Sequence, residues 1–139
     1  MATKLERSNF SVSQYLPERL GVLREATAGV CDSVLGLRKL ADFYYGFAAD
    51  LAPVDFARDV ISGLGVTIKT NPEELASVPN EGPCIVVANH PHGMLDGLLV
   101  MQLLGTVRPD FRVMANHFLA RFVQLRPLFF QINPFGGKE

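Results

Sequence analysis

The chain has 139 residues, a length that fits one domain rather than two. Apolar residues make up 48% and charged residues 19%, which excludes an intrinsically disordered chain. Thirteen basic and fourteen acidic residues give a net charge of −1, which speaks against electrostatic binding to nucleic acid. The chain shows no signal-peptide pattern and no stretch of 18 apolar residues. Cys31 and Cys84 do not form a close pair, so we expect a reducing, cytoplasmic location.

Two helices are expected at the start of the chain. Ser11 or Ser13 is expected to cap the first, which contains Leu16, Leu20 and Leu23, with Pro17 in its first turn. The second is predicted from Ser33 to about Ala49, because apolar residues recur there at helical spacing. The segment from Leu35 to Leu51 is rich in aromatic residues. It fits either a core helix of a bundle or a helix lying at a lipid interface, which implies peripheral membrane contact.

Turn-forming residues then divide the chain more finely. Pro53 is expected to end the second helix, and Asp55 to cap a third helix that runs through Leu64. A short strand is predicted within residues 64–71. Asn71 and Pro72, followed by two glutamates, form the N-cap, first position and acidic first turn of another short helix.

The second half alternates strand and helix patterns. A continuous β-branched run, CIVVAN at residues 84–89, is typical of a strand buried on both faces of a parallel sheet. The later segments read as a helix, a strand, a helix and a strand, over residues 98–105, 111–116, 117–125 and 128–133. We therefore predict an α/β fold, with N-terminal helices followed by the start of a mostly parallel sheet with right-handed crossovers. The expected division is a helical segment, 1–54, and part of an α/β domain, 55–139.

Groups suited to proton transfer are concentrated directly after the first of these strands. Asn89, His90, His92 and Asp96 fall within eight residues, where parallel sheets place their chemistry. A histidine is the usual general base near neutral pH, and a carboxylate beside it can fix its tautomer. Other interpretations stay open: Asp96 as a helix N-cap, His92 as a surface residue, and His90 as a structural hydrogen-bonding group. Cys84, inside the strand pattern, is expected to be an inert buried thiol.

The string GPCIVVANHPHGMLDG resembles the first motif of the glycerolipid acyltransferase superfamily, which includes glycerol-phosphate and lysophospholipid acyltransferases. The form Asn-His-Pro-x-Gly-x-x-Asp-Gly, with five residues between His90 and Asp96, resembles the hemolysin-like branch. Downstream, the Asn-Pro-Phe-Gly-Gly string resembles the family's second motif. The resemblance covers roughly Asp55 to Glu139. A third, phosphate-binding motif has no counterpart, so we expect an incomplete domain.

The resemblance implies transfer of an acyl group from acyl-CoA or acyl carrier protein to a glycerol-phosphate or lysolipid acceptor. His90 would be the general base and Asp96 its orienting partner, with neither metal nor cofactor. Asn89, Gly93 and Gly97 would shape the loop and let backbone approach the substrate. The acceptor wall would come from the second motif, through Asn133, Phe135 and Gly136.

Two rival interpretations remain. One is a metal-dependent hydrolase, in which His90, His92 and Asp96 would be ligands, because extended backbone places both imidazoles on one face. The other is a catalytically inactive fragment of an acyltransferase-like domain.

Overall fold

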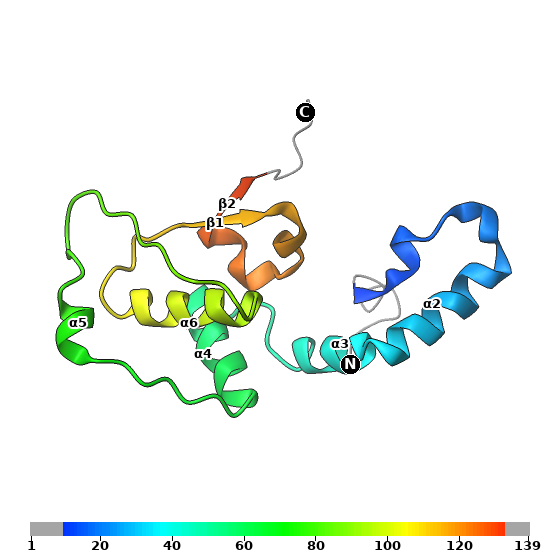
Figure 1. The fold of residues 1–139 in the computed structure, drawn as a ribbon, viewed down its shortest axis with the longest axis horizontal. Helices are drawn as coiled ribbons and strands as arrows, with labels where there is room; N and C mark the ends of the chain where they lie inside the picture. The colour runs from blue at the N-terminus through cyan, green and yellow to red at the C-terminus, as the bar shows by residue number, and fades with distance from the viewer. Residues whose placement is uncertain (1–9, 133–139) are drawn as a thin grey trace. The chain divides into compact units, whose positions relative to one another are not determined.

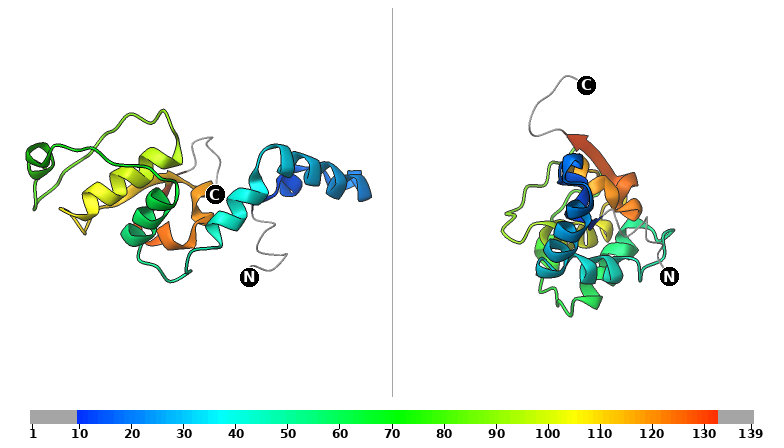
Figure 2. Two further views of the ribbon diagram at one scale, coloured as in Figure 1. Left: turned by 90° about the horizontal axis from the view of Figure 1, so that it is seen from below. Right: turned by 90° about the vertical axis from the view of Figure 1, so that its right-hand side faces the viewer.

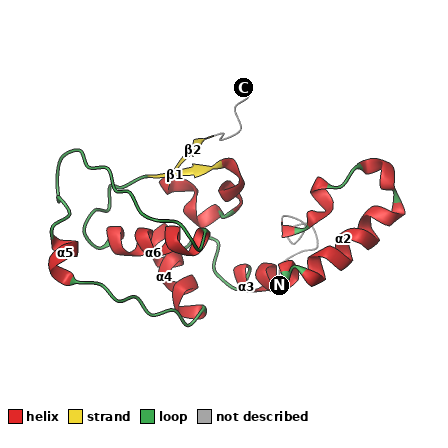
Figure 3. Ribbon diagram, viewed as in Figure 1, coloured by secondary structure: helices red, strands yellow, loops and turns green. Residues whose placement is uncertain are grey.

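The structure is a computed structural model in which residues 10–132 are described. The chain divides into two compact units, Met1–Ala48 and Ala49–Glu139 (Figure 1). The described residues form mixed helices with a small two-stranded parallel sheet, and most of the structured part is helical (Figure 3). The predicted α/β class therefore holds in part, with fewer strands than expected.

From residue 10 onward, the first unit contains two 3₁₀ turns and two α-helices. These are η2 (Val12–Tyr15), η3 (Glu18–Leu20), α2 (Val22–Val34) and α3 (Leu37–Tyr44). The expected capping by Ser11 is confirmed, but it caps the 3₁₀ turn η2 rather than an α-helix: Ser11 Oγ accepts from the Ser13 N–H at 3.1 Å. The predicted helix through Leu16 and Leu20 is wrong, because the α-helix begins only at Val22.

The predicted helix from Ser33 to Ala49 is also wrong in its bounds. Gly36 has a φ of +68°, a left-handed conformation that interrupts the helix between α2 and α3. Within the first unit, the α3 residue Tyr44 is buried and packs on Phe10, with ring centroids 5.2 Å apart. At Tyr44, the aromatic segment therefore serves as core.

The second unit is organised around two packed helices. Its helices and strands are α4 (Pro53–Gly63), α5 (Pro72–Ala76), α6 (Met94–Gly105), β1 (Val113–Asn116) and β2 (Phe129–Ile132), with 3₁₀ turns η4 (His117–Arg121) and η5 (Val123–Leu128). Phe56 of α4, Leu98 of α6 and Leu125 of η5 are its largest fully buried side chains. α4 and α6 pack against each other, as Figure 1 and the left-hand view of Figure 2 show.

Local sequence signals in this unit predict the start of α5 correctly, but three other predictions are wrong. Asn71 caps α5 by accepting from the Glu73 N–H at 3.0 Å, and Pro72 occupies its start, as predicted. Asp55 is not a cap, because α4 already begins at Pro53, whose fixed φ suits a first helical position. The predicted strand within 64–71 is absent, and that segment is a loop. The segment predicted as a helix over 117–125 consists of 3₁₀ turns.

The two strands pair in parallel, with Val113 opposite Phe129 and Asn116 opposite Ile132. Both lie within the ranges predicted as strands. By contrast, residues 84–89 form no strand, and the expectation of a strand buried on both faces is wrong: Ile85 is 91% exposed and Val87 is 87% exposed. A strand exists only through hydrogen bonds to a neighbour, and β1 and β2, the strands of the described chain, pair with each other.

Candidate active site

The chain reaches the predicted site as an extended segment and leaves it as helix α6. Gly93, with a φ of +61°, makes this transition at the N-cap of α6. Asp96 sits in the first turn of the helix, and its Oδ2 accepts a hydrogen bond from the His92 backbone N–H at 2.7 Å. Asp96 is therefore not the N-cap, although its carboxylate satisfies a backbone donor just before the helix, as acidic residues at this position commonly do.

Both histidines of the motif face this one carboxylate. His90 Nδ1 lies 3.8 Å from Asp96 Oδ2, and His92 Nδ1 lies 3.3 Å from Asp96 Oδ1. The Asp96 side chain is 15% exposed, whereas the imidazoles of His90 and His92 are 64% and 71% exposed. The structure thus brings together the three residues that the sequence singled out. Distance to the carboxylate does not separate the two histidines in favour of His90.

A cavity of about 720 Å³ does separate them. His90 and Asp96 both line it, and His92 lies outside its lining. Its apolar wall comes from the extended segment, α6 and the sheet, through Val86, Ala88, Val100, Leu104, Phe111, Val113, Met114 and Phe130. A pair of proton-transfer groups on the wall of a cavity with both apolar and polar lining is the arrangement expected of a substrate site.

The other predicted site residues differ in their placement. Asn89 and Gly97 line the cavity, and a Cβ added at Gly97 would meet Met101 Cε only at 4.0 Å. Gly93 shapes the backbone at the start of α6 but is not part of the lining. Asn133, Phe135 and Gly136, predicted to form the acceptor wall, lie outside the described residues.

The expectation that Cys84 is a buried thiol is wrong. Cys84 is exposed and lines the cavity, because the segment that carries it is not embedded in a sheet. Both cysteines are free.

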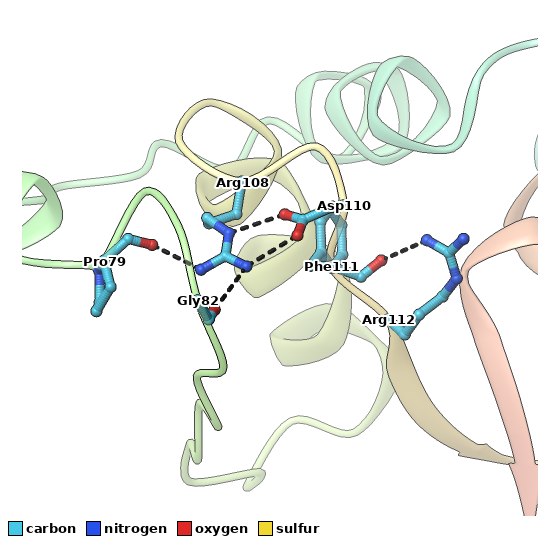
Figure 4. Close-up of polar contacts among 6 residues, drawn as sticks. All are labelled: Pro79, Gly82, Arg108, Asp110, Phe111 and Arg112. Atoms are coloured by element: carbon cyan, nitrogen blue, oxygen red, sulfur yellow. Dashed lines mark hydrogen bonds and ion pairs between the residues drawn. The ribbon is translucent and has the colours of Figure 1, made fainter.

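Sequence reasoning missed an ion pair on the cavity wall. Arg108 Nε and Nη2 donate to the two carboxylate oxygens of Asp110 at 2.8 and 2.9 Å (Figure 4). The hydrogen bonds from Arg108 lower the pKa of the Asp110 carboxyl, and the hydrogen bond to Asp110 raises the pKa of the Arg108 guanidinium. The only sequence signal is the spacing Arg-x-Asp, which is too common in turns to point to a site.

Neither a metal cluster nor a membrane-spanning helix is seen between residues 10 and 132. No three His, Cys, Asp or Glu side chains in that range are grouped so that they could hold a metal ion. No helix there has both the length and the apolar character needed to cross a bilayer.

Comparison with known proteins places the chain in a family. No curated protein and no solved structure matches the chain. The model of a family described as acyltransferase matches residues 37–139, which is well over half of the chain and includes the whole His90–Asp96 loop. The chain therefore belongs to this acyltransferase family.

Proposed function

We propose that this protein transfers an acyl group from an acyl thioester, acyl-CoA or acyl carrier protein, to a hydroxyl group of an acceptor. The acceptor is glycerol phosphate, a lysophospholipid or a related lysolipid. One observation carries the proposal: in a member of the acyltransferase family, His90 and Asp96 lie side by side on the wall of one cavity. In this proposal residues 55–139 carry the chemistry, and residues 1–54 form a helical lead-in.

The proposed reaction uses His90 as the general base. His90 takes the proton from the acceptor hydroxyl while that oxygen attacks the thioester carbonyl carbon. The new C–O ester bond forms, the C–S bond breaks, and the proton passes from the imidazolium to the departing thiolate. Asp96 stabilises the imidazolium through its negative charge. His90 Nδ1 and Asp96 Oδ2 are 3.8 Å apart, so a small movement of either side chain would form a hydrogen bond between them.

His90 is preferred to His92 because it shares the cavity with Asp96. The His92 ring also lies near the Asp96 carboxylate, at 3.3 Å. The hydrogen bond by which His92 orders the loop, however, is the one that its backbone N–H donates to Asp96. A side-chain substitution at His92 leaves this hydrogen bond in place. The two histidines therefore form a matched pair, differing by two positions and almost equal in exposure.

The proposed lysolipid acceptors indicate where in the cell the protein acts. Lysolipids reside in bilayers, so we propose that the chain works in the cytoplasm at a membrane surface. The N-terminal unit suits such contact, because Val22, Val30 and Val34 of α2 are 90%, 65% and 80% exposed.

The test is acyl transfer by the purified chain, followed by mass spectrometry of the acylated product with glycerol phosphate and with lysophospholipid. We expect His90→Gln to lower the rate by about 10²–10⁴-fold, the usual contribution of a general base. His92→Gln should lower it at most a few-fold, since the backbone hydrogen bond survives. A larger loss in His92→Gln than in His90→Gln would refute the assignment of the base. No transfer by the wild-type chain, with any acceptor, would favour the inactive-fragment interpretation.

A further inference from the structure

The segment that carries His90 has little structure of its own. Residues 79–92 contain no helix or strand, and every one of them is exposed. Within the described chain, its backbone makes no hydrogen bond to a helix or strand backbone. What holds such a segment in place must therefore come from side chains.

One arginine supplies the anchor at the upstream end. Arg108 Nη1 donates to the carbonyl oxygen of Pro79 at 2.7 Å, and Nη2 donates to that of Gly82 at 3.2 Å (Figure 4). The remaining two hydrogen bonds of the guanidinium go to Asp110. Its side chain is only 13% exposed, although the two carbonyls and the Asp110 carboxylate that it binds lie at the surface.

The downstream anchor is already part of the site. There, Asp96 accepts the hydrogen bond from the His92 backbone N–H. His90 lies between these two anchors, eight residues after Gly82 and two before His92. Among the described residues, the hydrogen bonds that tie the backbone of residues 79–92 to the rest of the unit are the two from Arg108 and the one to Asp96.

Arg108 is itself fixed to the helix that carries Asp96. Its backbone N–H donates to the Leu104 carbonyl at 2.7 Å, in the last turn of α6. The segment that carries His90 is therefore tied to α6 at both ends. Arg108, just after the end of α6, binds Gly82 upstream of His90. Asp96, at the start of α6, binds the His92 backbone downstream of His90. A segment that is held at both ends limits how far His90 can move from Asp96, whereas a segment held at one end does not.

We propose that Arg108 is a positioning residue for the reaction, which clamps the 79–82 turn to the end of α6 and so holds His90 against Asp96. This inference rests on the proposed function. Asp110 assists by fixing the plane of the guanidinium, so that the remaining donors point at the two carbonyls. The planar fork of arginine can serve three acceptor groups at once, which the single ammonium of lysine does less well.

The first test measures the backbone mobility of the segment and does not depend on enzymatic activity. Backbone ¹⁵N relaxation is measured for residues 84–90 in the wild type, Arg108→Ala and Arg58→Ala. Arg58 is a matched control, since it forms an exposed ion pair with Asp55 on α4, away from the cavity. We expect order parameters in 84–90 to fall below about 0.6 in Arg108→Ala only. Unchanged order parameters in Arg108→Ala would overturn the proposal.

The second test measures kcat and KM of acyl transfer. A misplacement of about 1 Å can cost about 10²-fold in rate, so Arg108→Ala should lower kcat by about ten- to a hundredfold. Arg108 also lines the cavity, so KM separates the two roles: a positioning role predicts a KM within about threefold of the wild-type value, and a larger rise, the sign of a lost substrate contact, would contradict it. Arg108→Lys should recover part of kcat, and Arg58→Ala should match the wild type. A mobile segment with unchanged kcat would overturn the positioning role. A wild-type chain without activity would instead contradict the proposed function, and the relaxation data would still decide whether Arg108 holds the segment.

Discussion

α4 leaves no room for a side chain at Gly105 of α6, and this leads to a prediction of opposite effects for two glycines of one helix. A Cβ placed on Gly105 would lie 2.6 and 2.7 Å from the two Cγ atoms of Val54. Ordinary contacts between carbon atoms are about 3.5–4.0 Å, so the overlap approaches 1 Å. Val54 is β-branched and sits in the first turn of α4, where its χ1 has little freedom. Gly97, in the same helix, has only a flexible methionine tip at 4.0 Å.

The magnitudes follow from these distances. Overpacking costs about 1–3 kcal/mol, and replacing a helical glycine by alanine returns about 0.5–1 kcal/mol. Gly105→Ala should therefore lower the free energy of unfolding of the second unit by about 1–2 kcal/mol. Gly97→Ala should raise it by about 0.5–1 kcal/mol, since only the gain in helix propensity applies. In a Val54→Ala background both Cγ atoms are removed and only the Val54 Cβ, at 3.2 Å, remains close, so most of the destabilisation by Gly105→Ala should disappear.

The measurement must report on the second unit by itself. The chain contains no tryptophan, and its three tyrosines, at positions 15, 44 and 45, all belong to the first unit. Native-state hydrogen exchange, read by mass spectrometry on peptides from α4 and α6, gives the required local free energies. Equal stabilisation by Gly105→Ala and Gly97→Ala would refute the reasoning, as would a destabilisation by Gly105→Ala that persists unchanged in the Val54→Ala background.

Three further outcomes are expected. Asp96→Asn should keep the loop hydrogen bond yet slow acyl transfer by about tenfold to a hundredfold, because an amide does not stabilise an imidazolium; Asp96→Ala should in addition destabilise the loop by about 1 kcal/mol, measured by hydrogen exchange at the start of α6. The lowered pKa of Asp110 contributes stability that is present above its unfolded value of about 3.9 and is lost as the pH falls through the folded value. The difference in melting temperature between the wild type and Asp110→Asn should therefore be constant above about pH 5 and shrink below pH 4; a difference that grows in acid would contradict this. Gly36→Ala should destabilise the first unit by about 1–2 kcal/mol, read by tyrosine fluorescence, because φ is +68° there, and Gly36→Asn should cost less.

Features set by neighbouring residues were predictable from the sequence. The cap of α5 at Asn71 depends on a side chain and a backbone N–H two residues apart, so its chemistry is complete within the motif. The meeting of His90, His92 and Asp96 is similarly local, since seven consecutive residues contain all three. The positions of β1 and β2 were also predictable, because both segments carry the apolar, β-branched or aromatic pattern of strands.

Features that depend on distant partners were not predictable in this way. The 84–89 segment has the composition of a buried strand, but composition supplies no neighbour to pair with. The helix from Ser33 was overextended because the apolar spacing continues across Gly36, and only the backbone angle reveals the break. The Arg108 clamp was invisible because its acceptors are main-chain carbonyls 26 and 29 residues away, which leave no mark on the sequence.

The extended segment also bears on how the chain behaves at high concentration. Its main-chain N–H and C=O groups face solvent next to Ile85 and Val87, two β-branched side chains that are almost fully exposed. An unpaired apolar stretch of this kind is a template on which strands of different molecules can associate. The segment that carries the proposed base thus also carries an aggregation hazard, and solubility and reactivity are expected to respond together to changes in this stretch.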